Sequence, residues 1–82
     1  MSPEQAYAII KKFRKDSFAN TCLEYDDFYL FNMIPNKYAD RDDYRPGSFH
    51  YRVDKLTGEI DMYNIFEDPV AYNSAVVHEL IN

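Results

Sequence analysis

Residues 53–60, Val-Asp-Lys-Leu-Thr-Gly-Glu-Ile, constrain the fold of this chain more than any other segment. On one side of its centre, Phe49, Tyr51 and Val53 alternate with polar residues, and on the other side Ile60 and Met62 continue the apolar face, which is the period of a strand with one buried face. Asp54 can accept hydrogen bonds from turn amides and Gly58 can adopt a positive φ, so residues 55–58 predict a four-residue turn between antiparallel strands. The pairs expected in this register are Val53–Ile60 and Tyr51–Met62 on the core side, and Arg52–Asp61 and His50–Tyr63 on the outer side.

An earlier hairpin is predicted around Asp26 and Asp27, because two strand-like runs meet there at a two-residue turn. The expected pairs are Tyr25–Phe28, Leu23–Leu30 and Thr21–Asn32. Leu23, Tyr25, Phe28 and Leu30 then share one face, and Cys22, Glu24, Tyr29, Phe31 and Met33 share the opposite face. The second run is apolar on both faces, which a strand with one wet face does not require.

Two helices are predicted to flank these strands. Ser2 and Gln5 form a capping-box pattern with Pro3 in the first turn, and the helix is expected to run to about Lys15. Its apolar stripe consists of Ala6, Ile9, Ile10 and Phe13. Its basic residues Lys11, Lys12, Arg14 and Lys15 indicate a solvated end that complements the helix dipole, with an anion or nucleic-acid site as the alternative.

Asp68 and Pro69 predict the start of the second helix, which is expected to run to the C-terminus. Its apolar stripe consists of Tyr72, Val76, Val77, Leu80 and Ile81. Because 82 residues leave no room for a second core, residues 1–82 are expected to form a single α+β domain. Its predicted architecture is two-layered, with about four antiparallel strands and both helices packed on one face.

Residues 35–47 contain Pro, Gly and mixed charge without a sustained period, so they are expected to form a long loop. Loops of this length in compact domains are often functional, and Tyr38 and Tyr44 are of a type enriched at binding hot spots. The alternative is a connector with scattered aromatic residues.

The net charge and the hydropathy of the chain limit the kinds of molecule it is expected to bind and the compartment in which it is expected to lie. A net charge of −5 opposes binding to nucleic-acid phosphate, and an acidic body suits a basic protein partner better. No apolar run approaches the roughly 18 residues needed to cross a membrane. The single Cys22 excludes an internal disulfide and favours a reducing compartment, so a cytoplasmic location is expected.

No catalytic or metal-binding motif is recognisable. Cys22, His50 and His78 are expected on separate elements, and Cys22 is interpreted as a small apolar filler. The aspartates around residues 40–43 do not follow the ligand order of a calcium loop, and two glycines cannot form a phosphate-cradling loop. We therefore expect neither an enzyme nor a cofactor or metal, with an enzyme that uses His50 as the most distant alternative.

The outer face of the predicted sheet is the expected site of partner binding, since Tyr, Phe, Met and Arg are enriched in interfaces. The predicted partner-binding residues are Tyr29, Phe31, Met33, Tyr63, His50 and Arg52, with Tyr38 and Tyr44 from the loop. Two alternatives remain open. The loop can fold back over Tyr29 and Phe31 and make them core, and the same face, or a strand edge, can form a homodimer.

The initial helix, the run Tyr25-Asp26-Asp27-Phe28-Tyr29-Leu30-Phe31-Asn32, the polar loop and residues 51–60 together resemble the small bacterial immunity proteins of polymorphic toxin systems. The similarity is to the group proposed as inhibitors of papain-type proteases, and it covers most of the chain. That group typically has a Trp in the aromatic strand, where this chain has Phe28 and Tyr29. The resemblance implies a stoichiometric inhibitor that neutralises a toxin without turnover.

Overall fold

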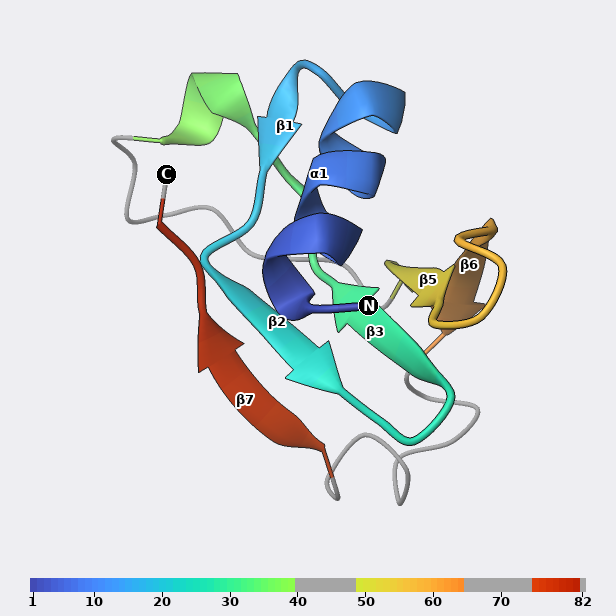
Figure 1. Cartoon of the computed structure of the whole chain (residues 1–82). Helices are drawn as coiled ribbons and strands as arrows, with labels where there is room; N and C mark the ends of the chain where they lie inside the picture. Colours follow the sequence, from blue (N-terminus) through green and yellow to red (C-terminus); the bar gives the residue numbers. More distant parts are fainter. Residues whose placement is uncertain (40–48, 65–74, 82) are drawn as a thin grey trace.

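The computed structural model describes residues 1–39, 49–64 and 75–81, and these residues form one α-helix, seven strands and a 3-10 turn (Figure 1). In chain order, the elements are α1 (Pro3–Phe13), β1 (Ser17–Phe18), β2 (Thr21–Glu24), β3 (Phe28–Phe31), β4 (Ile34–Pro35), the turn η1 (Asn36–Tyr38), β5 (Phe49–Asp54), β6 (Ile60–Asn64) and β7 (Val76–Glu79). The described part of residues 35–47, expected to be loop, therefore begins with a strand end and a helical turn.

Five strands form one sheet in the order β6-β5-β3-β2-β7, and β1 pairs with β4 in a separate two-stranded sheet. All of these pairings are antiparallel. The α+β class is therefore confirmed, whereas the expected count of two helices and four strands is wrong.

The predicted C-terminal helix is wrong over residues 76–79, which form the edge strand β7. The expected cap at Asp68 and Pro69 lies outside the described residues. Val76 and Val77 are β-branched and favour a strand, and β7 pairs with β2 along its whole length. The apolar spacing of this segment fits either a helix or a strand, and the long-range pairing with β2 decides between them.

Both predicted hairpin registers are confirmed. Leu23 pairs with Leu30 across the first turn, and the amide of Tyr25 donates to the Phe28 carbonyl at 2.9 Å. In the second hairpin the observed pairs are Val53–Ile60, Arg52–Asp61, Tyr51–Met62 and His50–Tyr63.

Asp54 organises the turn between β5 and β6. Its Oδ1 accepts from the amides of Leu56 (2.8 Å) and Thr57 (2.9 Å), and the Gly58 amide donates to its carbonyl at 2.9 Å. The amide donors of Thr57 and Leu56 hold the pKa of Asp54 below its ordinary value. Gly58 has a φ of 75°, a conformation that residues with a Cβ rarely adopt.

Helix α1 begins with the predicted capping box, in which Ser2 Oγ accepts from the Gln5 amide and Gln5 Oε1 accepts from the Ser2 amide. The helix lies across the sheet and contacts β2, β3 and β5 (Figure 1). Ala6 and Ile10 are fully buried on its inner face. The core cluster beneath it consists of Ala6, Ile10, Ala19, Cys22, Tyr29, Phe31, Met33 and Val53.

The outer placement expected for Tyr29, Phe31 and Met33 is wrong, because these side chains face α1 and are only 2%, 0% and 9% exposed. The cause is the pairing of β3 with β5, which joins the two hairpins. It sets Tyr29 beside Val53 and Phe31 beside Tyr51, so both pairs share one face. A face assignment that differs by one residue moves every side chain of a strand to the other side. The alternative that placed Tyr29 and Phe31 in the core is confirmed as to their burial, and the described element that packs on them is α1. The loop to which that alternative assigned the burial lies largely outside the described residues.

Candidate protein-binding surface

Strand β6 is the outermost described strand on its side of the five-stranded sheet. Mostly exposed side chains gather on its helix side, and mostly half-buried ones gather on the opposite side. We call the residues on the helix side the Phe13 cluster, and those on the opposite side the Phe28 cluster. The Phe13 cluster comprises Phe13, Arg14, Tyr51 and Met62. The Phe28 cluster comprises Tyr25, Phe28, Arg52, Asp61 and Tyr63.

The Phe13 cluster is the more apolar of the two. Phe13 is 57% exposed at the end of α1, and its ring meets Tyr51 edge-on with centroids 5.9 Å apart. Tyr51 pairs across the ladder with Met62, which is 63% exposed. The guanidinium of Arg14 lies 5.2 Å from the centroid of the Tyr51 ring. Exposed aromatic and methionine side chains beside an arginine are the composition found at protein interfaces.

The Phe28 cluster is built by ring stacking on the outer face of the sheet. Phe28 stacks on Tyr25 with centroids 4.6 Å apart and lies 5.8 Å from Tyr63. Arg52 lies over the Phe28 ring at 5.2 Å and forms an ion pair with Asp61 at 3.1 Å. These contacts hold the arginine in place before any partner arrives, which reduces the entropy lost on binding.

The structure places the remaining predicted partner-binding residues in three different settings. His50, Arg52 and Tyr63 lie together on the outer face, where His50 is buried and the other two are half-buried. Tyr38 lies apart on η1, with the ammonium of Lys37 at 5.2 Å from its ring. Tyr44 lies outside the described residues.

Phe13 and Met62 were missed because the sequence pattern assigned both to a buried face. Their exposure arises because α1 ends at Phe13 while β6 is the outermost described strand on its side of the sheet. An apolar residue at the end of a helical stripe is the only local signal that such a position is exposed.

The structure also gathers three titratable groups that the sequence placed on separate elements. Glu24 accepts from Lys55 Nζ at 2.8 Å and lies 2.6 Å from His78 Nε2. The hydrogen bond from Lys55, and then that from His78, lowers the pKa of Glu24, and Glu24 in turn raises the pKa of Lys55. Glu24 thereby connects β2 to β7 and to the turn after β5.

Cys22 pairs with His78 across the β2–β7 ladder, yet its thiol is fully buried in the core. Burial raises the pKa of Cys22 to about 12, so the thiolate is scarce at neutral pH. The side chain therefore contributes packing rather than a nucleophile in this arrangement.

Within residues 1–39, 49–64 and 75–81, no group of three or more His, Cys, Asp or Glu side chains is placed to hold a metal ion. The helix in this part of the chain is too short and too polar to cross a membrane.

Comparison with known proteins gives no relative: the chain matches no family model, no curated protein and no solved structure.

Proposed function

We propose that this chain is a non-catalytic protein-binding domain whose partner is held at the two clusters that flank β6. The observation that carries the proposal is the exposure of Phe13 and Met62 on either side of Tyr51, with Arg14 packed over that ring. Contiguous exposed apolar side chains of this kind lose solvent contact when a partner binds. The net charge of −5 favours encounter with a basic partner.

The specific role we propose is that of an immunity protein, which neutralises a toxin by stoichiometric binding. The resemblance of residues 25–32 and 51–60 to immunity proteins supports this role, together with the pre-ordered arginines of the two clusters. Such a role needs affinity and specificity, which aromatic residues and Arg supply most effectively.

The test is co-expression with the product of a toxin-like open reading frame beside this gene. The proposal expects rescue of growth and a 1:1 complex on size-exclusion chromatography with light scattering. Met62→Asp is expected to weaken the complex at least tenfold, roughly the loss for removing an interface anchor. Val77→Asp is the matched control, because Val77 is 60% exposed on the opposite edge strand β7. Equal loss in both variants, or none in either, would exclude the β6 side as the binding surface.

The second candidate is a homodimerising module, favoured by the exposed position of Met62 on the outermost described strand β6. Edge strands with apolar side chains pair readily with a second copy. Light scattering across a hundredfold concentration range separates the two candidates. A dimer that Met62→Asp dissociates supports the module, and a monomer throughout counts against it.

A further inference from the structure

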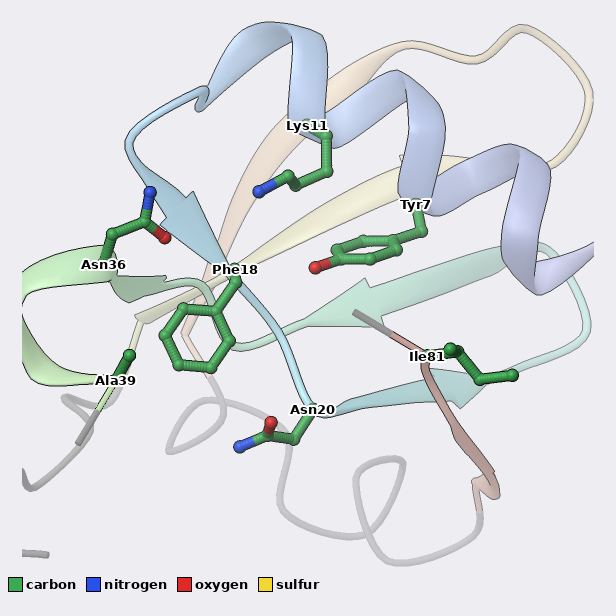
Figure 2. A pocket seen from close by; sticks show the side chains of 7 residues that line it. All are labelled: Tyr7, Lys11, Phe18, Asn20, Asn36, Ala39 and Ile81. Atoms are coloured by element: carbon green, nitrogen blue, oxygen red, sulfur yellow. The ribbon is translucent and has the colours of Figure 1, made fainter. Parts of the chain in front are cut away.

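A groove of about 560 Å³ lies on the other side of α1, away from β6. Residues from four separate segments line it, and Figure 2 shows Tyr7 and Lys11 extending from α1 toward Phe18. The lining residues are Tyr7, Lys11, Phe18, Asn20, Asn36, Ala39 and Ile81. We call this site the Tyr7 groove. Its volume is within the range of sites that take small organic ligands.

The walls of the Tyr7 groove are held by contacts that exist without a ligand. The Tyr7 ring stacks on the buried Phe31 with centroids 5.9 Å apart, and its hydroxyl accepts from the Ala19 amide at 3.1 Å. The backbone amide of Asn36 donates to the Asp16 carbonyl at 2.8 Å, which fixes η1 against the segment that follows α1. The groove is therefore largely preformed, so little ordering accompanies binding.

The ammonium group of Lys11 is the cation of the groove. Lys11 Nζ donates to the Ser17 carbonyl at 2.6 Å, which holds the ammonium in place, but it forms no ion pair with any described carboxylate. A cation bonded only to a neutral carbonyl retains its attraction for an anion. Lys11 and Tyr7 are four residues apart on α1 and so lie on the same face of the helix.

Two side-chain amides in the groove, those of Asn20 and Asn36, also make no hydrogen bond to the described residues. Figure 2 shows the Asn36 side chain above the Phe18 ring and the Asn20 side chain below it. Each amide offers two donors and an acceptor. The groove thus combines an aromatic wall, one cation and two solvent-exposed side-chain amides.

We propose that the Tyr7 groove binds a small organic anion with an aromatic or aliphatic body. The anionic group pairs with Lys11, the apolar body lies against Phe18 and Tyr7, and the amides of Asn20 and Asn36 orient the polar end. This site is independent of the partner-binding surface at β6.

The test uses 8-anilinonaphthalene-1-sulfonate as the anionic probe and N-phenyl-1-naphthylamine as its uncharged analogue. Fluorescence titration of the wild-type protein is expected to give saturable 1:1 binding of the anion. Lys11→Met keeps most of the apolar stem and is expected to weaken the anion about tenfold while leaving the analogue within about twofold. Lys12→Met is the matched control, because Lys12 is the next residue on α1, is exposed and does not line the groove.

Spectra of the ¹⁵N-labelled protein then locate the probe. Selective shifts of the side-chain amide signals of Asn20 and Asn36 support the proposal. Shifts confined to residues of the Phe13 cluster would overturn it, and so would absence of binding to the wild-type protein. If Lys11→Met and Lys12→Met weaken binding of the anionic probe equally, the probe is attracted to the helix as a whole, and the proposed site is overturned. Equal weakening of the anion and the analogue by Lys11→Met would overturn the role of the charge.

Discussion

Phe31 provides the sharpest test of the fold, because its role differs completely between a core and an outer face. Its side chain is 0% exposed and stacks on Tyr7 at an interplanar angle of 19°. Truncation to Ala is expected to cost about 3–5 kcal/mol. A chain of 82 residues has a total stability of roughly 4–12 kcal/mol, so that variant risks complete unfolding.

Phe31→Leu is the more informative variant, since it keeps most of the apolar volume and loses the stacked ring. The ring contact is worth about 0.5–1.5 kcal/mol and the altered shape adds to the cost, which gives about 1–2 kcal/mol in total. At about 4–8 °C per kcal/mol for a domain of this size, Tm is expected to fall by roughly 4–16 °C. The measurement is thermal unfolding followed by far-ultraviolet circular dichroism, with urea unfolding as the second probe.

Phe13→Leu is the matched control, because it makes the same chemical change at a ring that is 57% exposed. Its free energy of unfolding is expected to change by no more than about 0.5 kcal/mol. If Phe31→Leu leaves Tm unchanged, or lowers it no more than Phe13→Leu does, then the assignment of the β3 faces is incorrect.

Three further predictions concern single residues. Gly58→Ala is expected to lower the free energy of unfolding in urea by about 1–2 kcal/mol, because φ is 75° at this residue. Steric contact adds little, since the atom nearest to the new Cβ, Ile9 Cδ1, lies at an ordinary contact distance of 3.6 Å. An unchanged urea midpoint would refute the turn geometry. The folded-state pKa of Glu24 lies below its ordinary value of 4.5, so its stabilisation is complete above that pH and is lost as the pH falls through the lower folded-state pKa. The stability difference between wild type and Glu24→Gln is therefore expected to shrink on acidification below pH 4.5, and a difference that stays constant in urea titrations from pH 7 to pH 3 would argue against the network. Cys22, with a pKa of about 12, is expected to react with a disulfide reagent at pH 8 at least about a hundredfold more slowly in the native protein than in denaturant, and comparable rates would show that the thiol is accessible.

The residue types in the two turns were sufficient to predict the registers of both hairpins. The Asp26-Asp27 turn and the Asp54–Gly58 turn each determine which residues pair across them, and the observed registers agree with the predicted ones. Turn length and residue type act over a few positions, so they can be interpreted without knowledge of the rest of the chain.

Neither hairpin's own sequence predicts how the two hairpins pair with each other. The pairing of Tyr29 with Val53 joins strands on opposite sides of a long connection, and it reverses the face that the aromatic strand presents. The strand β7 was missed for the same reason, since the spacing of Val76, Val77 and Leu80 suits a helix until β2 is available as a partner. Long-range pairing therefore overrides local periodicity in both places.

The candidate sites were harder still to predict. The Phe13 cluster draws on α1, β5 and β6, and the Tyr7 groove on four segments, so neither has a contiguous sequence pattern. Only the spacing of Tyr7 and Lys11, one helical turn apart, was available as a signal.

The position of β7 beside β2 also affects how the chain folds during synthesis. The bond between Glu24 and His78 joins residues 54 positions apart. Until residues 76–79 leave the ribosome, that edge of β2 lacks the strand that occupies it in the finished sheet. Contacts of such long sequence separation form late, and an open edge in the interval is a site for intermolecular pairing. A chain in which β7 has not yet paired with β2 is thus expected to be the form most prone to aggregation.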